Sequence, residues 1–184
     1  MTRLYLVRHS AVTVRPERPI AEWHLSPEGR AAVDRLAEEP YWASVRGIHT
    51  SPEPKAVATA QRIAARHGLP IRIERDLHEV ERGGWAGDGY RELVQRYFAG
   101  EALDGWEARD EALARAGACI DGIAARHEGL DAGIVSHGLA LTLYIADRFA
   151  LDAEAVFAMW GRIRFPDVAA VDPQARQIVR GFGG

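Results

Sequence analysis

Residues 4–10, Leu4-Tyr5-Leu6-Val7-Arg8-His9-Ser10, run from an apolar segment straight into a cationic pair with no turn-forming residue between them. An apolar run of this length predicts a buried β-strand that ends at Arg8 and His9. Open α/β sheets bind ligands at the carboxyl ends of their strands, so this ending predicts a ligand site that contains a guanidinium and an imidazole. The simpler alternative is a strand whose last two side chains are merely solvated.

A second stretch, Ala132-Gly133-Ile134-Val135-Ser136-His137-Gly138, also ends an apolar strand in a histidine, and the helical pattern of residues 139–149 follows it. If the two strands are neighbours in a parallel sheet, the imidazoles of His9 and His137 project from one edge, where Arg8 can hold an anion. A neutral imidazole is a nucleophile near neutral pH, and phosphate oxyanions need fixed positive charge. The pair therefore predicts phosphoryl transfer through a phosphohistidine.

Five segments, in order along the chain, resemble the motifs of the histidine phosphatase superfamily, also called the phosphoglycerate mutase-like family. They are Arg8-His9-Ser10, Leu25-Ser26-Pro27-Glu28-Gly29, Thr50-Ser51-Pro52-Glu53-Pro54-Lys55-Ala56, Leu77-His78-Glu79-Val80-Glu81-Arg82-Gly83-Gly84-Trp85-Ala86-Gly87 and Val135-Ser136-His137-Gly138. One short motif is a weak signal, but five in order form a strong one. The resemblance implies an α/β fold, a three-layer α/β/α sandwich with a mostly parallel central sheet.

The resemblance also implies the roles of the site residues. His9 would accept the phosphoryl group, Arg8 and His137 would bind phosphate, and Glu79, rather than Glu81, would be the proton donor. The implied activity is that of a metal-independent phosphatase, which hydrolyses a small phosphomonoester through a phosphohistidine on His9.

The sequence departs from the family pattern at three places in the predicted pocket. Ser10 replaces a glycine, Lys55 replaces the second phosphate-binding arginine, and no asparagine follows His9 in its loop. Lysine keeps the charge but loses the planar two-pronged contact, so we expect a looser phosphate pocket. Arg15 or Arg18 can substitute for the asparagine, and Ser10, Arg15 and Arg18 are the candidate substrate-binding residues.

Two other functions are compatible with the same motifs. The first is a mutase of the cofactor-dependent phosphoglycerate type, which returns the phosphoryl group to a sugar acid before water removes it. The chain is shorter than the usual mutase and its motifs differ from those of that subgroup, so hydrolysis is favoured. The second is a non-catalytic domain that binds phosphorylated ligands, which the departures at Ser10 and Lys55 suggest.

The composition is typical of one globular enzyme domain over residues 1–184, with 47% apolar and 27% charged residues. The net charge of −3 provides no general attraction to nucleic acid or anionic membranes, so positive charge would have to be concentrated locally to hold the small phosphorylated substrate that the resemblance implies. The single Cys119 excludes an internal disulfide framework and is expected to be an inert buried thiol. We find no secretory signal pattern and no membrane-spanning apolar run, and we expect a cytoplasmic protein.

No cofactor and no metal are expected, because the remaining histidines lack metal-ligand spacing and no glycine-rich nucleotide loop is present. His49 precedes Thr50-Ser51 and is a candidate neighbour of the pocket. The sequence does not predict an oligomeric state. The remaining elements are predicted from periodicity and capping residues. They are helices at 27–39, 53–67, 90–99, 106–127 and 153–160, strands at 45–50 and 70–74, and a closing hairpin of 167–172 with 177–180.

Overall fold

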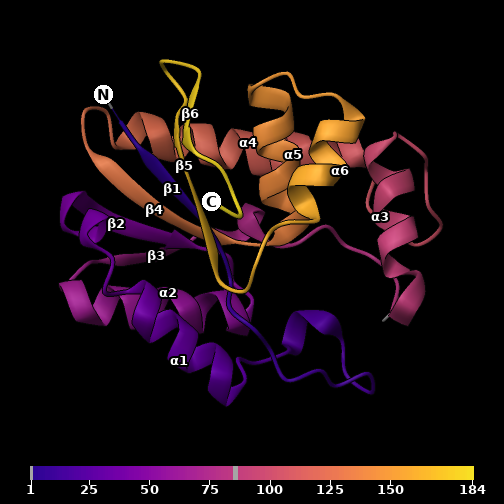
Figure 1. The fold of residues 1–184 in the computed structure, drawn as a ribbon, viewed down its shortest axis with the longest axis horizontal. Coiled ribbons are helices and arrows are strands. Elements are labelled where there is room, and N and C mark those ends of the chain that lie inside the picture. The colour runs from indigo at the N-terminus through magenta and orange to yellow at the C-terminus, as the bar shows by residue number, and fades with distance from the viewer. Residues whose placement is uncertain (1, 85–86) are drawn as a thin grey trace.

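The computed structural model describes residues 2–84 and 87–184, whose strands form a six-stranded sheet (Figure 1). The strand order is β3-β2-β4-β1-β5-β6; the pairs among β1, β2, β3 and β4 are parallel, while β5 and β6 run antiparallel to their neighbours. The strands are β1 (Leu4–Arg8), β2 (Val45–Thr50), β3 (Ile71–Ile73), β4 (Asp131–Ser136), β5 (Asp167–Asp172) and β6 (Gln177–Arg180). The helices are α1 (Pro27–Leu36), α2 (Pro54–His67), α3 (Tyr90–Phe98), α4 (Arg109–Arg126), α5 (Gly138–Arg148) and α6 (Ala153–Trp160), with short 3-10 turns η1 (Ile20–Glu22), η2 (Pro40–Ser44), η3 (Arg75–Leu77) and η4 (Gly87–Gly89).

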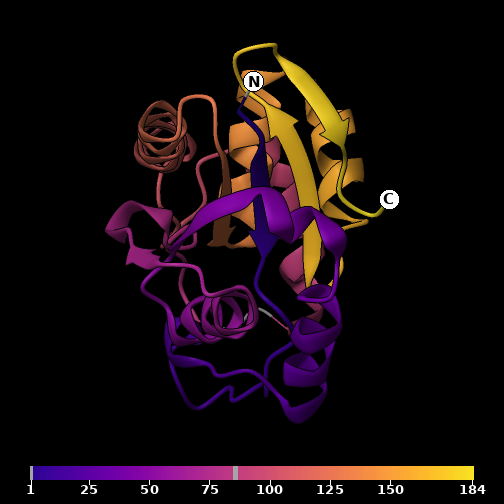
Figure 2. The same cartoon turned by 90° about the vertical axis from the view of Figure 1, so that its left-hand side faces the viewer.

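Helices cover both faces of the sheet, as Figures 1 and 2 show, with α1 and α2 on one face and α4, α5 and α6 on the other. The alternation of side chains along β1 explains this arrangement. Leu4 and Leu6 belong to the apolar core that contains residues of α4 and α5, whereas Tyr5 and Val7 belong to the core beneath α1 and α2. Both faces of β1 are therefore buried, which confirms the predicted three-layer sandwich with a mostly parallel sheet.

The register of the central strands places their carboxyl ends level with one another. Arg8 pairs with Ser136, and Thr50 pairs with Val135. The segments that follow β1 and β2 stay hydrogen-bonded to β4. The His9 amide donates to the Ser136 carbonyl at 3.0 Å, and the Ser51 amide donates to the Val135 carbonyl at 2.9 Å. The structure thus confirms that the strands ending at His9 and His137 are parallel neighbours.

Several predicted boundaries differ from the structure. The helix expected from residue 106 begins at Arg109, because Trp106 instead packs its ring against Tyr90 and Tyr97 ahead of the helix. The helix capped by Ser26 ends at Leu36, and β3 at the sheet edge spans only Ile71–Ile73. Within residues 2–84 and 87–184, no helix is long and apolar enough to cross a membrane.

Candidate active site

His9 lies directly after β1 and its side chain is almost completely buried. Its Nδ1 lies 2.8 Å from the backbone oxygen of Ser10. A carbonyl oxygen can only accept, so Nδ1 carries the proton and Nε2 keeps its lone pair. Burial, together with the neighbouring His137, Lys55 and Arg8, lowers the pKa of His9 well below its ordinary value. The ring is therefore a neutral imidazole at neutral pH, with Nε2 as the nucleophilic atom.

Arg8 is the last residue of β1, and its guanidinium is fixed from two sides. Its Nη1 donates to the Ile163 carbonyl at 3.0 Å, and its Cζ lies 3.4 Å above the centre of the Phe165 ring. Gly138 leaves the room that the guanidinium needs, since a Cβ at this position would lie 3.2 Å from Arg8 Nε. Burial lowers the pKa of Arg8 only to about 10, so its charge persists at neutral pH.

His137 follows β4 and is completely buried, with its ring centre 5.1 Å from that of His9. Its Nε2 lies 2.7 Å from the Ser51 hydroxyl and 3.3 Å from Glu53 Oε1. Its Nδ1 has no hydrogen-bond partner among the described residues. Burial and the cations Lys55, Arg82 and Arg8 lower the pKa of His137 well below its ordinary value, so this ring is also neutral at neutral pH.

Lys55 lies in the first turn of α2, as predicted, and only 3% of its surface is exposed. Its Nζ donates to the Ile20 carbonyl at 2.8 Å and also to the Glu53 carboxylate. An ammonium has three donors, so two are engaged and one remains for an anion. These two contacts oppose the looser pocket that we expected from a lysine, because they immobilise its flexible side chain.

Glu79 lies after η3, and its carboxylate faces the N-terminus of α5. Oε1 accepts hydrogen bonds from the amides of Val80 at 2.9 Å and Ala140 at 3.1 Å, and Oε2 accepts one from Leu139 at 3.2 Å. The carboxylate thus satisfies amides of a helix start that has no side-chain cap of its own. The segment that carries Glu79 is fixed by Arg115, which donates to the backbone oxygens of three residues, Asp76, His78 and Glu79.

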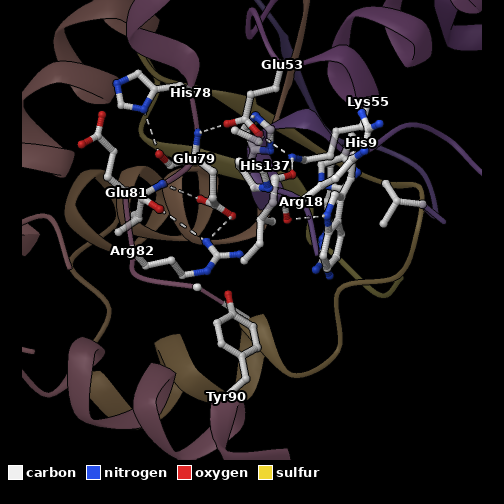
Figure 3. Close-up of a pocket in the computed structure, with 18 of the residues that line it drawn as sticks. His9, Arg18, Glu53, Lys55, His78, Glu79, Glu81, Arg82, Tyr90 and His137 are labelled. Carbon is white, nitrogen blue, oxygen red and sulfur yellow. Dashed lines mark hydrogen bonds and ion pairs between the residues drawn. The ribbon is translucent and has the colours of Figure 1, made fainter. Parts of the chain in front are cut away.

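These side chains line one cleft of about 1230 Å³ at the carboxyl edge of the sheet (Figure 3). Figure 3 shows the polar ends of Arg82 and Tyr90 directed towards Glu79, and the carboxylate of Glu81 directed away from His9. Burial raises the pKa of Tyr90 to about 12, so its phenol stays neutral. The cleft is rich in cations, which suits a phosphorylated ligand. They are Arg8, Arg18, Lys55, Arg75, Arg82 and Arg91.

The other candidate residues lie in different surroundings. Arg18 lines the cleft, whereas Arg15 is exposed and lies 3.8 Å from Glu17 in a surface ion pair. Ser10 is buried outside the cleft lining, and its hydroxyl donates to the Gly29 carbonyl at 2.8 Å. A Cβ at Gly29 would lie 2.1 Å from the Ala11 carbonyl oxygen, so the close approach of the Ala11 backbone to residue 29 requires a glycine.

His49 does not line the cleft, contrary to our expectation. Its Nδ1 lies 2.7 Å from Glu74, and its Nε2 lies 3.0 Å from His127 Nε2. Among the described residues, no group of three or more His, Cys, Asp or Glu side chains is arranged to hold a metal ion. Trp85 and Ala86 of the glycine-rich motif lie outside the described residues.

Sequence reasoning missed several residues of the site, Glu53 and Phe165 among them. Glu53 turns its carboxylate inward between Lys55 and His137, and the only sequence signal is an acid two positions before the expected cation. Phe165 packs on Arg8 and lies with its ring centre 5.5 Å from that of His9. No pattern in the sequence connects Phe165 with β1, because the contact depends on the path of a distant loop.

The fold and the cleft define a class of α/β protein that presents two neutral imidazoles and several fixed cations to an anionic ligand. The chain belongs to branch 1 of the histidine phosphatase superfamily, whose family model matches residues 4–162. The motif resemblance in the sequence is thereby confirmed.

Solved structures with the same fold cover nearly the whole chain. Bacillus stearothermophilus YhfR is 24% identical with a TM-score of 0.77, covering 94% of this chain and 91% of its own. A mycobacterial glucosyl-3-phosphoglycerate phosphatase complexed with VO3 is 22% identical with a TM-score of 0.78, and the match covers 92% of this chain and 90% of that protein. A phosphoserine phosphatase from Entamoeba histolytica in complex with 3-phosphoglyceric acid is 18% identical with a TM-score of 0.75, covering 98% and 95%. No curated protein matches the chain.

Proposed function

We propose that the protein is a phosphatase that hydrolyses a small phosphomonoester through a phosphohistidine on His9, without a metal ion. The observation that carries the proposal is the state of His9, a neutral ring whose Nδ1 donates to a carbonyl and whose Nε2 is unprotonated. This ring lies beside Arg8, Lys55 and His137, which supply the positive charge and hydrogen-bonding nitrogens that a phosphoryl group needs.

In the proposed first step, His9 Nε2 attacks phosphorus in line and the bond to the leaving oxygen breaks. Glu79 donates a proton to that oxygen, which releases the alcohol. Oε1 accepts the amides of Val80 and Ala140, whereas Oε2 accepts only that of Leu139 and lies 4.0 Å from Arg82 Nη1, so Oε2 has more room for a hydrogen bond to the leaving oxygen. In the second step, water attacks the phosphohistidine, Glu79 takes a proton from that water, and phosphate leaves.

Positioning and fixed charge would supply most of the acceleration, since a phosphoryl transition state requires little covalent chemistry from the protein. Support comes from the family membership and from structural neighbours that are themselves named as phosphatases. The lining of the cleft also includes Arg18, Arg75 and Arg91, which would help to select the organic part of the substrate.

The test is steady-state hydrolysis of p-nitrophenyl phosphate and a panel of phosphorylated metabolites, in the presence of EDTA, by the wild type and His9→Ala. Turnover that survives EDTA and disappears in His9→Ala supports the proposal. Turnover that persists in His9→Ala contradicts it. A parallel assay of 3-phosphoglycerate with catalytic 2,3-bisphosphoglycerate detects mutase activity, and phosphate binding without any turnover would indicate a binding domain.

A further inference from the structure

Glu53 places a carboxylate inside a pocket that otherwise suits anions. Its side chain is only 9% exposed, and three groups contact it. Oε2 accepts from Lys55 Nζ, while Oε1 accepts from the Glu79 amide at 2.9 Å and lies 3.3 Å from His137 Nε2. A buried carboxylate repels phosphate and costs free energy to desolvate, so its presence here needs a compensating role.

We propose that Glu53 is a positioning residue that fixes the protonation of His137, so that this ring becomes an imidazolium when a tetrahedral dianion enters the pocket. The inference rests on the proposed function, because it assigns the docked dianion to the phosphate position beside His9. Glu53 contacts neither the reacting atoms nor the substrate in this proposal, and it acts through His137 and Lys55.

The contacts of His137 determine which nitrogen carries the first proton. Nε2 faces a carboxylate oxygen and the Ser51 hydroxyl, both of which can accept, so the neutral ring carries its proton on Nε2. Nδ1 then holds the lone pair, and it is buried without a partner. When a dianion binds, Nδ1 takes up one proton from solvent, and the imidazolium donates to the anion on one side and to Glu53 on the other.

The charges around His137 explain why this proton arrives only with the ligand. Before binding, the nearby cations outnumber Glu53 and oppose a further positive charge. A bound dianion offsets those cations, and the Glu53 carboxylate then stabilises the imidazolium. The groups concerned are Arg8 and His9 at the end of β1, Glu53 and Lys55 at the start of α2, and His78, Glu79 and Arg82 in the segment after η3.

The contact between Glu53 and Lys55 also explains how a lysine can bind phosphate where the family has an arginine. The Glu53 carboxylate and the Ile20 carbonyl accept two of the three hydrogen bonds that the Lys55 ammonium can donate. These contacts fix the orientation of the ammonium, which lacks the rigid planar geometry of an arginine guanidinium. Glu53 also accepts the Glu79 amide, so one carboxylate connects the cation, the second histidine and the segment of the proton donor.

The Glu53→Gln variant separates two explanations of Glu53, because repulsion of the anion and stabilisation of the His137 imidazolium predict opposite changes in anion binding. If Glu53 only repels anions, its neutralisation tightens anion binding at every pH. If Glu53 stabilises the His137 imidazolium, its neutralisation lowers the pKa of His137 in the complex. Anion binding that requires this proton then begins to weaken, as the pH rises, at a lower pH than in the wild type.

The experiment is calorimetric titration of the whole protein with sodium sulfate, whose charge stays at −2, between about pH 5 and pH 9 across the range where histidine titrates. Titrations in buffers of different ionisation enthalpy measure the proton uptake. We expect uptake of about one proton by the wild type near neutral pH. In Glu53→Gln, the alkaline fall in affinity should move to lower pH by about one unit, which is a tenfold weaker affinity on that limb.

Two variants control the experiment. Glu53→Asp keeps the charge and should keep proton uptake, whereas Glu81→Gln removes an equal charge away from His137 and should leave the pH profile unchanged. Tighter sulfate binding by Glu53→Gln at all pH values, or an unchanged profile with full proton uptake, overturns the inference. Sulfate binding with proton uptake in a protein without phosphatase activity would refute the proposed function and keep the inference. Absence of sulfate binding by a wild type that hydrolyses phosphomonoesters would overturn the inference and leave the proposed function standing, because the turnover assay tests that function separately.

Discussion

Replacing Glu79 with glutamine tests the proton donor and the structural role of the same carboxylate. The amide has nearly the same shape but cannot donate a carboxylic proton to an alkoxide leaving group. General acids contribute about 10²–10⁴-fold, so turnover of alkyl phosphates should fall by at least about 100-fold. p-Nitrophenolate leaves without a proton, so its release should slow by less than about tenfold.

The structure also predicts a loss of stability in this variant. Glu79 accepts three backbone amides, two of them from the first turn of α5, and its side chain is 14% exposed. Glutamine keeps one acceptor oxygen but replaces the other with an amide nitrogen that cannot accept, so a backbone amide loses its partner and the free energy of unfolding should fall by about 1–2 kcal/mol.

The assay compares first-turnover rates for an alkyl phosphate and p-nitrophenyl phosphate, alongside urea unfolding. Glu81→Gln is the matched control, since its carboxylate points away from His9, and it should leave both rates and the stability unchanged. Equal losses for the good and the poor leaving group in Glu79→Gln would refute its role as proton donor.

Three further predictions concern other parts of the site. Lys55→Met should lower kcat/KM for p-nitrophenyl phosphate by roughly 10- to 100-fold, because a charged hydrogen bond of about 1.5–3 kcal/mol is lost; an unchanged kcat/KM would show that its ammonium does not contact the phosphoryl group. Gly29→Ala should lower the free energy of unfolding by about 1–3 kcal/mol in a thermal or urea melt, since its Cβ would lie 2.1 Å from the Ala11 carbonyl oxygen. The pKa values of His9 and His137 are lowered in the folded state, so the unfolded chain binds more protons below about pH 6.5. Stability should therefore fall as the pH decreases below that value, by up to about 1.4 kcal/mol per pH unit for each ring, and a pH-independent urea midpoint between about pH 6.5 and pH 5 would contradict this.

The strands and the candidate site residues at their carboxyl ends were predictable from sequence, because both depend on local patterns. An apolar run ending in Arg8-His9 and another ending in His137 mark two strand ends, and parallel pairing brings their ends to one edge. The cap at Ser26 and the first-turn position of Lys55 also follow from local sequence.

The remaining features depend on contacts between segments far apart in the chain. The direction of the Glu53 carboxylate is set by His137 and by the Glu79 amide, and Phe165 meets Arg8 from the loop between α6 and β5. Arg115 on α4 donates a hydrogen bond to the backbone oxygen of Glu79, and the sequence spacing of the two residues does not predict this contact. Packing between distant segments, rather than local periodicity, determines each of these contacts.

The central claim, that His9 accepts the phosphoryl group, is tested most directly by trapping the phosphorylated protein. The wild type is mixed with excess p-nitrophenyl phosphate and quenched in alkali, where phosphohistidine survives, and the intact mass and fragment masses are then measured. The account predicts one phosphoryl group per chain, located on His9 and absent from His9→Gln. A phosphoryl group on another residue, or rapid turnover by His9→Gln, would contradict it.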